Sequence, residues 1–139
     1  MKIIIPLFLF ILLLTQTVSA ELVVVVNEKN DINSLSKSEV IDLFMGRHTK
    51  FSNGIVVRTI DHDKKSAIKA LFYQNLIGKS LARVNAYWAR LRFTGRSNPP
   101  KTINNYTKAE QFVLNNISGI VYLERNKIKS PVKIVYSFQ

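Results

Sequence analysis

The sequence predicts an α/β fold of one domain, in which helices cover both sides of a partly parallel sheet. Its 139 residues suit one domain of ordinary size. Short runs rich in β-branched residues alternate with longer segments whose apolar residues recur at helical spacing. Strands separated by helices indicate parallel pairing, because a parallel connection has to cross over the sheet. The four expected strands are Leu22 to Val26, Ile55 to Ile60, Gly119 to Leu123 and Val132 to Phe138.

Residues 1–20 are predicted to be a cleaved secretory signal. Lys2 gives a positive start, an uncharged apolar run of twelve residues follows, and Val18-Ser19-Ala20 offers a cleavage site before Glu21. A membrane anchor is the alternative, but this run contains Pro6 and is shorter than the roughly 20 residues that a spanning helix needs. We therefore expect a mature domain of residues 21–139, soluble outside the cytoplasm.

Composition excludes several kinds of site. Without Cys the chain has no disulfide framework, thiolate nucleophile, Cys-ligated metal centre or lipid-modified Cys. The net charge of +11 attracts anions such as phosphate, phosphorylated sugars, lipid headgroups and nucleic acid. Part of this charge is expected only to keep the domain soluble. The lysines expected on outer helix faces are Lys37, Lys69 and Lys108.

The first strand is continuously apolar, which suits a strand buried on both faces. A capping box of Ser36 and Glu39 then predicts a helix that Gly46 closes. Asn53-Gly54 predicts a turn before the second strand. Two helices follow, beginning at Ser66 and Ser80. Their expected inner residues are Ile68, Leu71, Phe72 and Leu76 in the first helix, and Leu81, Val84, Trp88 and Leu91 in the second.

The segment from Gly95 to Lys101 is predicted to be a loop, because Pro99-Pro100 cannot be helical. Thr107 and Glu110 form a second capping-box pattern for a short helix. The last two strands then complete the sheet. The aromatic residues Phe44, Phe72 and Trp88 are expected in the core.

Asp61-His62-Asp63 is the one local cluster of side chains that handle protons or metals. Alternation along an extended segment turns His62 away from the two carboxylates. A metal centre normally draws ligands from several elements, and the only other histidine is His48. We therefore expect a solvated loop in which an Asp caps the following helix, with no metal site and no cofactor.

The motifs of common hydrolases are missing from the sequence. It contains no G-x-S-x-G, H-E-x-x-H or Walker-type motif, so we expect no enzymatic activity. Ser66 is more informative, because a helix that starts after a buried strand and a loop directs free amides and its positive dipole end outward. Such a terminus can hold an oxyanion, although a Ser hydroxyl there can also simply cap the helix.

Several segments together resemble the phosphate-binding periplasmic proteins of ABC transporters, of the type 2 periplasmic binding protein superfamily, and most closely a group of short secreted phosphate-transporter substrate-binding-like proteins. The resemblance covers most of residues 22–123. The segments are Leu35 to Arg47, Phe51 to Gly54, Ser66 with Phe72, Tyr87-Trp88 with Phe93-Thr94-Gly95, and Ser118 to Tyr122.

This resemblance implies a single lobe with a mixed sheet flanked by helices, located in the periplasm. It also implies contact with phosphate or a related oxyanion through the hydroxyl of Ser66 and the amides of Ala67 and Ile68. Ala67 and Ile68 stand where the family has Gly and Thr, and His62 stands where it has an Arg. Positive charge is then expected from Arg58 or His62, and one lobe without a second predicts weak binding.

Two other partners are considered. A lobe that has lost its anion site would serve as a protein-interaction module for a membrane transporter, a sensor or an envelope assembly, with a basic surface at Arg90, Arg92 and Arg96. The same arginines beside Trp88 are typical of single-strand nucleic-acid binders. Nucleic acid is not expected, because Trp88 is assigned to the core and the protein is exported.

Overall fold

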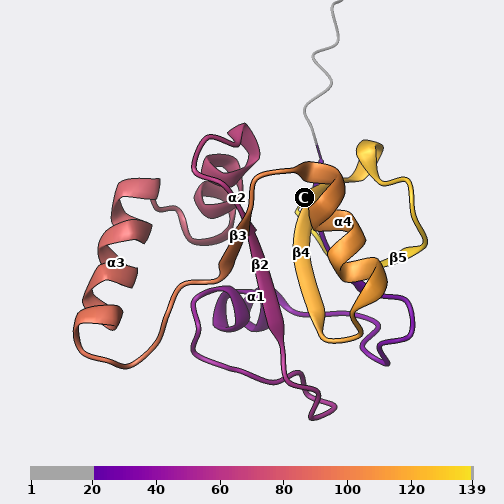
Figure 1. The fold of residues 1–139 in the computed structure, drawn as a ribbon, viewed down its shortest axis with the longest axis horizontal. Coiled ribbons are helices and arrows are strands. Elements are labelled where there is room, and N and C mark those ends of the chain that lie inside the picture. The colour runs from indigo at the N-terminus through magenta and orange to yellow at the C-terminus, as the bar shows by residue number, and fades with distance from the viewer. Residues whose placement is uncertain (1–20, 139) are drawn as a thin grey trace, which may run out of the picture.

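The computed structural model describes residues 21–138, so the expected signal sequence lies outside the described residues. A five-stranded sheet has helices on both faces (Figure 1). In chain order the elements are β1 (Leu22–Asn27), α1 (Lys37–Phe44), β2 (Arg58–His62), α2 (Ala67–Ile77), α3 (Leu81–Phe93), β3 (Lys101–Ile103), α4 (Tyr106–Asn115), β4 (Gly119–Glu124), the short 3-10 helix η1 (Arg125–Lys127) and β5 (Val132–Ser137).

The sheet is mixed, as predicted. Its strand order is β3-β2-β4-β1-β5. β2 pairs in parallel with β3 on one side and with β4 on the other. β1 is antiparallel to both β4 and β5. The parallel half of the sheet therefore carries the crossover helices, and the β2–α2 junction lies at one end of this half.

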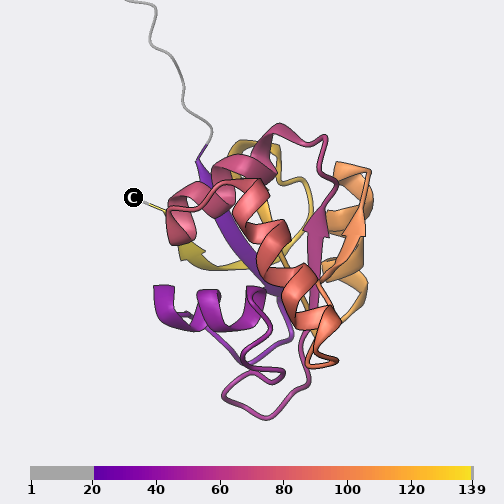
Figure 2. The same cartoon turned by 90° about the vertical axis from the view of Figure 1, so that its left-hand side faces the viewer.

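The two faces of the sheet are covered by different helices. α4 lies on one face, whereas α1, α2 and α3 lie on the other side (Figure 2). All six residues of β1 are buried, because successive side chains enter the two cores in turn. Phe44, Phe72 and Trp88 are buried as predicted, and the ring of Phe72 stacks on Tyr122 at 3.7 Å between centroids.

Local signals set the start and end of α1. The Ser36 hydroxyl accepts from the amide of Glu39, and the Glu39 carboxylate accepts from the amide of Ser36, which completes the predicted capping box. Gly46 follows with a positive φ of 71°. A Cβ there would lie 2.8 Å from the Trp88 ring, so this glycine also permits the close approach of α3.

Three expectations about elements are corrected. β2 begins at Arg58 rather than at Ile55, because the segment before it turns back to form an isolated bridge between Lys50 and Val56. The proline loop ends in an unexpected strand, β3, whose three residues pair with β2. Leu71, expected inside, is 38% exposed.

The second predicted capping box is also wrong. Asn105 caps α4, and its side chain accepts from the amide of Lys108. Glu110 instead accepts hydrogen bonds from the amides of Lys129 and Ser130, in the connection between η1 and β5. Sequence spacing pointed to Thr107, but this residue lies one position inside the helix.

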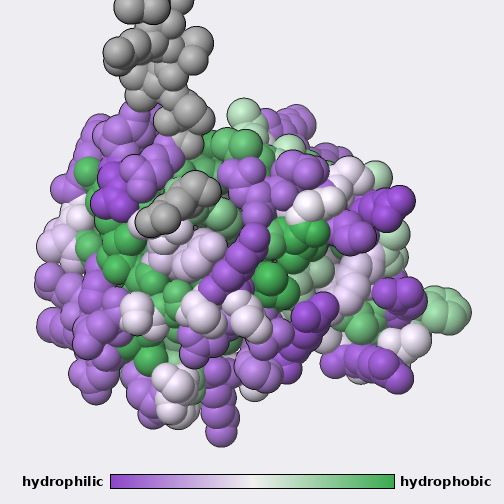
Figure 3. Space-filling model, turned by 180° about the vertical axis from the view of Figure 1, so that it is seen from behind, coloured by the Kyte–Doolittle hydropathy of each residue, from purple (hydrophilic) through white to green (hydrophobic). Residues whose placement is uncertain are grey.

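Hydrophilic side chains dominate much of the surface seen from behind, and hydrophobic area gathers near its middle (Figure 3). Within residues 21–138, no helix is long and apolar enough to cross a membrane.

Candidate functional site

The β2–α2 junction presents free hydrogen-bond donors. Ser66 is the N-cap residue of α2, with φ −72° and ψ 126°, yet its hydroxyl makes no capping hydrogen bond. The amide of Ser66 donates to the Asp63 carbonyl at 2.8 Å. Among the described residues, no group accepts a hydrogen bond from the amides of Ala67 and Ile68, as is usual for the first turn of a helix. The alternative in which Ser66 simply caps α2 is therefore not what the structure shows.

The same junction is positively charged. α2 is 11 residues long, and its N-terminus carries the positive end of the helix dipole. Lys64 and Lys65 are exposed in the loop that leads into Ser66. Neither lysine was predicted to belong to the site, although both lie directly before the N-cap serine in the sequence.

Arg58 is not brought to this junction, which corrects the expectation that it assists there. It lies at the first residue of β2, and the junction follows the last residue, His62. Four residues of strand separate the two by about 13 Å. The Arg58 guanidinium instead lies over the Phe112 ring at 4.9 Å and donates to Asn116 at 3.4 Å.

His62 is enclosed rather than available to an anion. Its Nε2–H donates to the Tyr122 carbonyl at 2.7 Å, and its ring stacks on Tyr106. The residue is 3% exposed. Burial lowers the pKa of His62 below its ordinary value, against a smaller opposing effect of the hydrogen bond to Tyr122. The imidazole is therefore neutral near pH 7 and brings no positive charge to Ser66.

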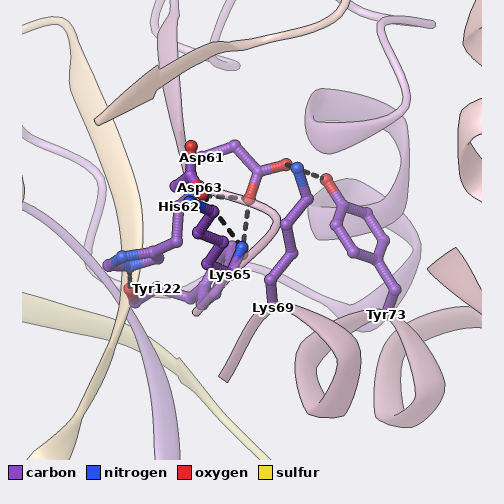
Figure 4. Close-up of polar contacts among 7 residues, drawn as sticks. All are labelled: Asp61, His62, Asp63, Lys65, Lys69, Tyr73 and Tyr122. Carbon is purple, nitrogen blue, oxygen red and sulfur yellow. Dashed lines mark hydrogen bonds and ion pairs between the residues drawn. The ribbon is translucent and has the colours of Figure 1, made fainter. Parts of the chain in front are cut away.

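Asp61 is the centre of a buried polar cluster, not part of a solvated loop as expected (Figure 4). Its carboxylate accepts from the Tyr73 hydroxyl at 2.6 Å, from the Tyr122 hydroxyl in a very short hydrogen bond, and from the amide of His62 at 2.7 Å. Burial, followed by the nearby Asp61 charge, raises the pKa of both tyrosine hydroxyls. They therefore remain donors across the physiological pH range.

Lys69 completes this cluster. It was expected on an outer helix face, but it is 9% exposed and its ammonium lies 3.6 Å from the Asp61 carboxylate. The sequence did carry a signal for this cluster. Asp61 lies near the end of a strand, and Lys69 and Tyr73 are four residues apart on the helix that follows, so both can face that strand end. Asp63 accepts from the amide of Lys65 at 2.9 Å and so shapes the loop before α2.

The carboxylates and histidines do not converge on a cation. In the part of the chain that the structure describes, no three His, Asp or Glu side chains are grouped as a metal ion would require. Within residues 21–138, Lys69 is the only charged side chain that pairs with the buried Asp61. The N-terminus of α2 presents a hydroxyl and two backbone amides as hydrogen-bond donors.

Comparisons with known proteins give structural matches. No family model matches the chain, and no curated protein matches it in sequence. An ABC-type phosphate transport receptor from Vibrio cholerae matches with a TM-score of 0.65 and 14% identity, over 83% of this chain and 45% of the receptor. PstS from Borrelia burgdorferi matches with a TM-score of 0.62 and 10% identity, over 83% of this chain and 46% of that protein.

A third match was solved with bound phosphate. It is a Clostridium perfringens protein described as a phosphate ABC transporter substrate-binding protein, with a TM-score of 0.66 and 12% identity, over 83% of this chain and 44% of that one. This chain thus spans less than half the length of these structures. Its mixed sheet and flanking helices have the fold of a single lobe that resembles part of the phosphate ABC transporter substrate-binding proteins.

Proposed function

We propose that this protein is an extracytoplasmic solute-binding-like protein that contacts phosphate or a related oxyanion at the N-terminus of α2. The main observation behind this proposal is that Ser66 occupies the N-cap position while its hydroxyl makes no capping hydrogen bond. The hydroxyl and the amides of Ala67 and Ile68 are thus donors for one anion. The fold supports the proposal, because one similar structure was solved with bound phosphate.

Binding is expected to be weak and sensitive to salt. The donors lie on one lobe, and Lys64 and Lys65 are exposed, so salt screens their attraction. Arg58 and His62 add nothing, because one lies at the far end of β2 and the other is enclosed. A millimolar dissociation constant, or about −4 kcal/mol, is the expected scale.

Calorimetric titration with phosphate and sulfate at low salt tests the site. We expect Ser66→Ala to abolish the heat of phosphate binding while leaving stability unchanged within about 0.5 kcal/mol. Ser80→Ala is the matched control, because the Ser80 hydroxyl does cap α3 by accepting from the amide of Arg83. This control should lose about 1 kcal/mol of stability and keep phosphate binding. Equal phosphate binding by Ser66→Ala and the unaltered protein would refute the proposal.

The cellular setting belongs to the same proposal. We expect export to the periplasm, with residues 1–20 removed, and action together with an ABC transporter or a sensor rather than as an enzyme. The similar structures are transport receptors and substrate-binding proteins. N-terminal sequencing of the exported protein should begin at Glu21. An intact Met1 terminus in the membrane fraction would instead support the anchor.

A second candidate is a protein-interaction module. Residues 64–109 contain six lysines and four arginines but no Asp or Glu. Apart from the buried Lys69 and from Lys108 in α4, they lie in α3, in β3 and in the adjoining loops, which form a basic layer. Phe93, at the end of α3, is 93% exposed beside Arg90, Arg92 and Arg96. Such a surface suits an acidic protein partner. A specific partner recovered from periplasmic extract, whose capture Phe93→Ala weakens while phosphate gives no heat, would favour this candidate.

A further inference from the structure

A small cavity lies between β2, β3, α2 and α3, apart from the α2 N-terminus. Its volume is about 190 Å³, and its lining does not include Ser66, Ala67 or Ile68. One part of the lining is polar and the other is apolar. The polar residues are Asp61, Lys69, Asn85, Arg92 and Thr102, and the apolar part is formed mainly by Trp88 with Pro99-Pro100.

Lys69 is the polar group that the protein itself leaves without a hydrogen-bond acceptor. The residue is nine-tenths buried, and its ammonium lies 3.6 Å from Asp61, an ion-pair distance beyond hydrogen-bond length. Within residues 21–138 no atom accepts a hydrogen bond from this ammonium. The Asp61 carboxylate is already shared among the hydroxyls of Tyr73 and Tyr122 and the amide of His62. The Lys69 side chain is mostly buried, but its ammonium still reaches solvent, so its free donors are open to an acceptor that enters the cavity.

A second cation faces the same cavity from α3. Asn85, Trp88 and Arg92 follow one another at helical spacing along one side of α3, and all three line the cavity. Among the described residues, the Arg92 side chain takes part in no hydrogen bond or ion pair. A guanidinium can donate two parallel hydrogen bonds to a carboxylate. With Lys69 and Arg92 against Asp61 alone, the lining carries a net positive charge.

The size and the walls limit the anion. At about 30 Å³ for each water, the cavity holds about six waters, or a molecule with roughly as many non-hydrogen atoms. The indole of Trp88 and the two proline rings offer apolar contact to part of that molecule. An inorganic anion would leave these walls without an apolar partner. A short alkyl chain that ends in a carboxylate matches both parts of the lining.

We propose that this cavity is a binding site for a short-chain aliphatic carboxylate, whose carboxylate lies between Lys69 and Arg92 and whose alkyl part packs on Trp88. The site is independent of the phosphate contact at Ser66. It gives the protein a second class of ligand, selected by the apolar wall as well as by charge.

Trp88 supplies the readout, because it is the only tryptophan of the chain. Titration with butyrate should change the Trp88 fluorescence in a saturable manner, and the uncharged isostere butyramide should not. Arg92→Gln is expected to weaken butyrate binding about tenfold or more. Arg90→Gln is the matched control, because Arg90 is also a basic residue of α3 but lines a different cavity. It should bind butyrate as the unaltered protein does.

The variants also separate this site from its neighbours. Trp88 borders a second cavity beside Gly46 and His48, so the effect of Arg92→Gln, rather than the fluorescence change alone, assigns the site. Arg92 is exposed, so its replacement leaves the buried Asp61–Lys69 pair intact. Ser66→Ala should not alter butyrate binding. Lack of saturation with butyrate, or equal weakening in Arg92→Gln and Arg90→Gln, would overturn the proposal whatever the outcome of the phosphate titration.

Discussion

Asp61 joins three elements through one carboxylate. It lies in β2, its tyrosine partners come from α2 and β4, and Lys69 of α2 supplies its counter-charge. The Asp61 side chain is 4% exposed and the Lys69 side chain 11% exposed. A buried charge of this kind is tolerated because its hydrogen bonds and its ion pair replace water.

Replacing Asp61 by Asn should therefore be strongly destabilising. The change leaves Lys69 as a buried charge without its partner and removes a strong acceptor from two tyrosine hydroxyls. We expect the free energy of unfolding to fall by about 3–5 kcal/mol in urea denaturation. Asp63→Asn is the control, because Asp63 lies in the following loop and an Asn can still accept from the amide of Lys65. A similar loss in both variants would contradict this account of Asp61.

His62 should make the stability depend on pH. Burial lowers the pKa of the folded-state imidazole below 6.5, so the unfolded chain binds more protons as the pH falls. The contribution of His62 is thus fully present above pH 6.5 and is lost as the pH falls through the lower folded-state pKa. The free energy of unfolding should decrease by up to about 1.4 kcal/mol per pH unit in this window.

In the variant His62→Gln the free energy of unfolding should depend less on pH between about pH 6.5 and 5. This window lies above the range in which most carboxylates titrate. The matched control is His48→Gln, which changes the other histidine, on the surface beside Asp42. This control leaves the surroundings of His62 unaltered, so the slope that His62 supplies should remain. Unfolding curves at several pH values measure both effects, and an unchanged slope in His62→Gln would exclude His62 as its source.

At the scale of elements, α4 and the chain that returns to β5 are held together by Glu110. Its carboxylate accepts from the amides of Lys129 and Ser130 at 2.7 Å each, although it belongs to the second turn of α4. The residue is therefore occupied by a long-range contact and cannot cap its own helix. Asn105 takes that role.

The two candidate caps of α4 can be told apart by mutation. Asn105→Ala removes the side chain that accepts from the amide of Lys108 and should lower the free energy of unfolding by about 1 kcal/mol. Thr107→Ala should change it by less than about 0.5 kcal/mol, because Thr107 is exposed and makes no cap. Thermal or urea unfolding of both variants checks this. A larger loss of stability in Thr107→Ala than in Asn105→Ala would show that Thr107, and not Asn105, caps α4.

Positive charge is distributed asymmetrically over the whole molecule. Half of its 20 basic residues fall within residues 64–109, a stretch without a single acidic residue. Apart from the first turn of α4, this stretch builds α2, α3 and β3, which lie together toward one side of the molecule (Figure 1). A concentration of like charge on one side orients the molecule toward anionic surfaces and partners.

Two double variants with the same change in net charge test this asymmetry. Arg83→Glu with Arg90→Glu changes the basic layer, whereas Lys29→Glu with Lys37→Glu changes exposed lysines outside it. We expect the first pair to elute from a cation-exchange column at clearly lower salt than the second. Equal elution would show that net charge alone, and not its placement, determines adsorption.

The sequence by itself determined the features that depend on neighbours along the chain. The Ser36 capping box, the Ser80 cap, the left-handed Gly46 and the buried aromatic stripe of Phe72 and Trp88 rest on contacts within a few residues or on helical periodicity. The α/β class followed from the alternation of strands and helices. For the candidate site, the position of Ser66 at the start of α2 was also predictable.

Only the tertiary structure decided which charged residues are buried and which come together. Asp61 and the Tyr122 hydroxyl are 61 residues apart in sequence, and Glu110 meets Ser130 from 20 residues away. Such contacts depend on which strands pair, and the order β3-β2-β4-β1-β5 is not encoded in local spacing. The extended β2 keeps Arg58 away from Ser66 by the length of the strand. His62 is enclosed because Tyr106 of α4 and Tyr122 of β4 pack against its ring.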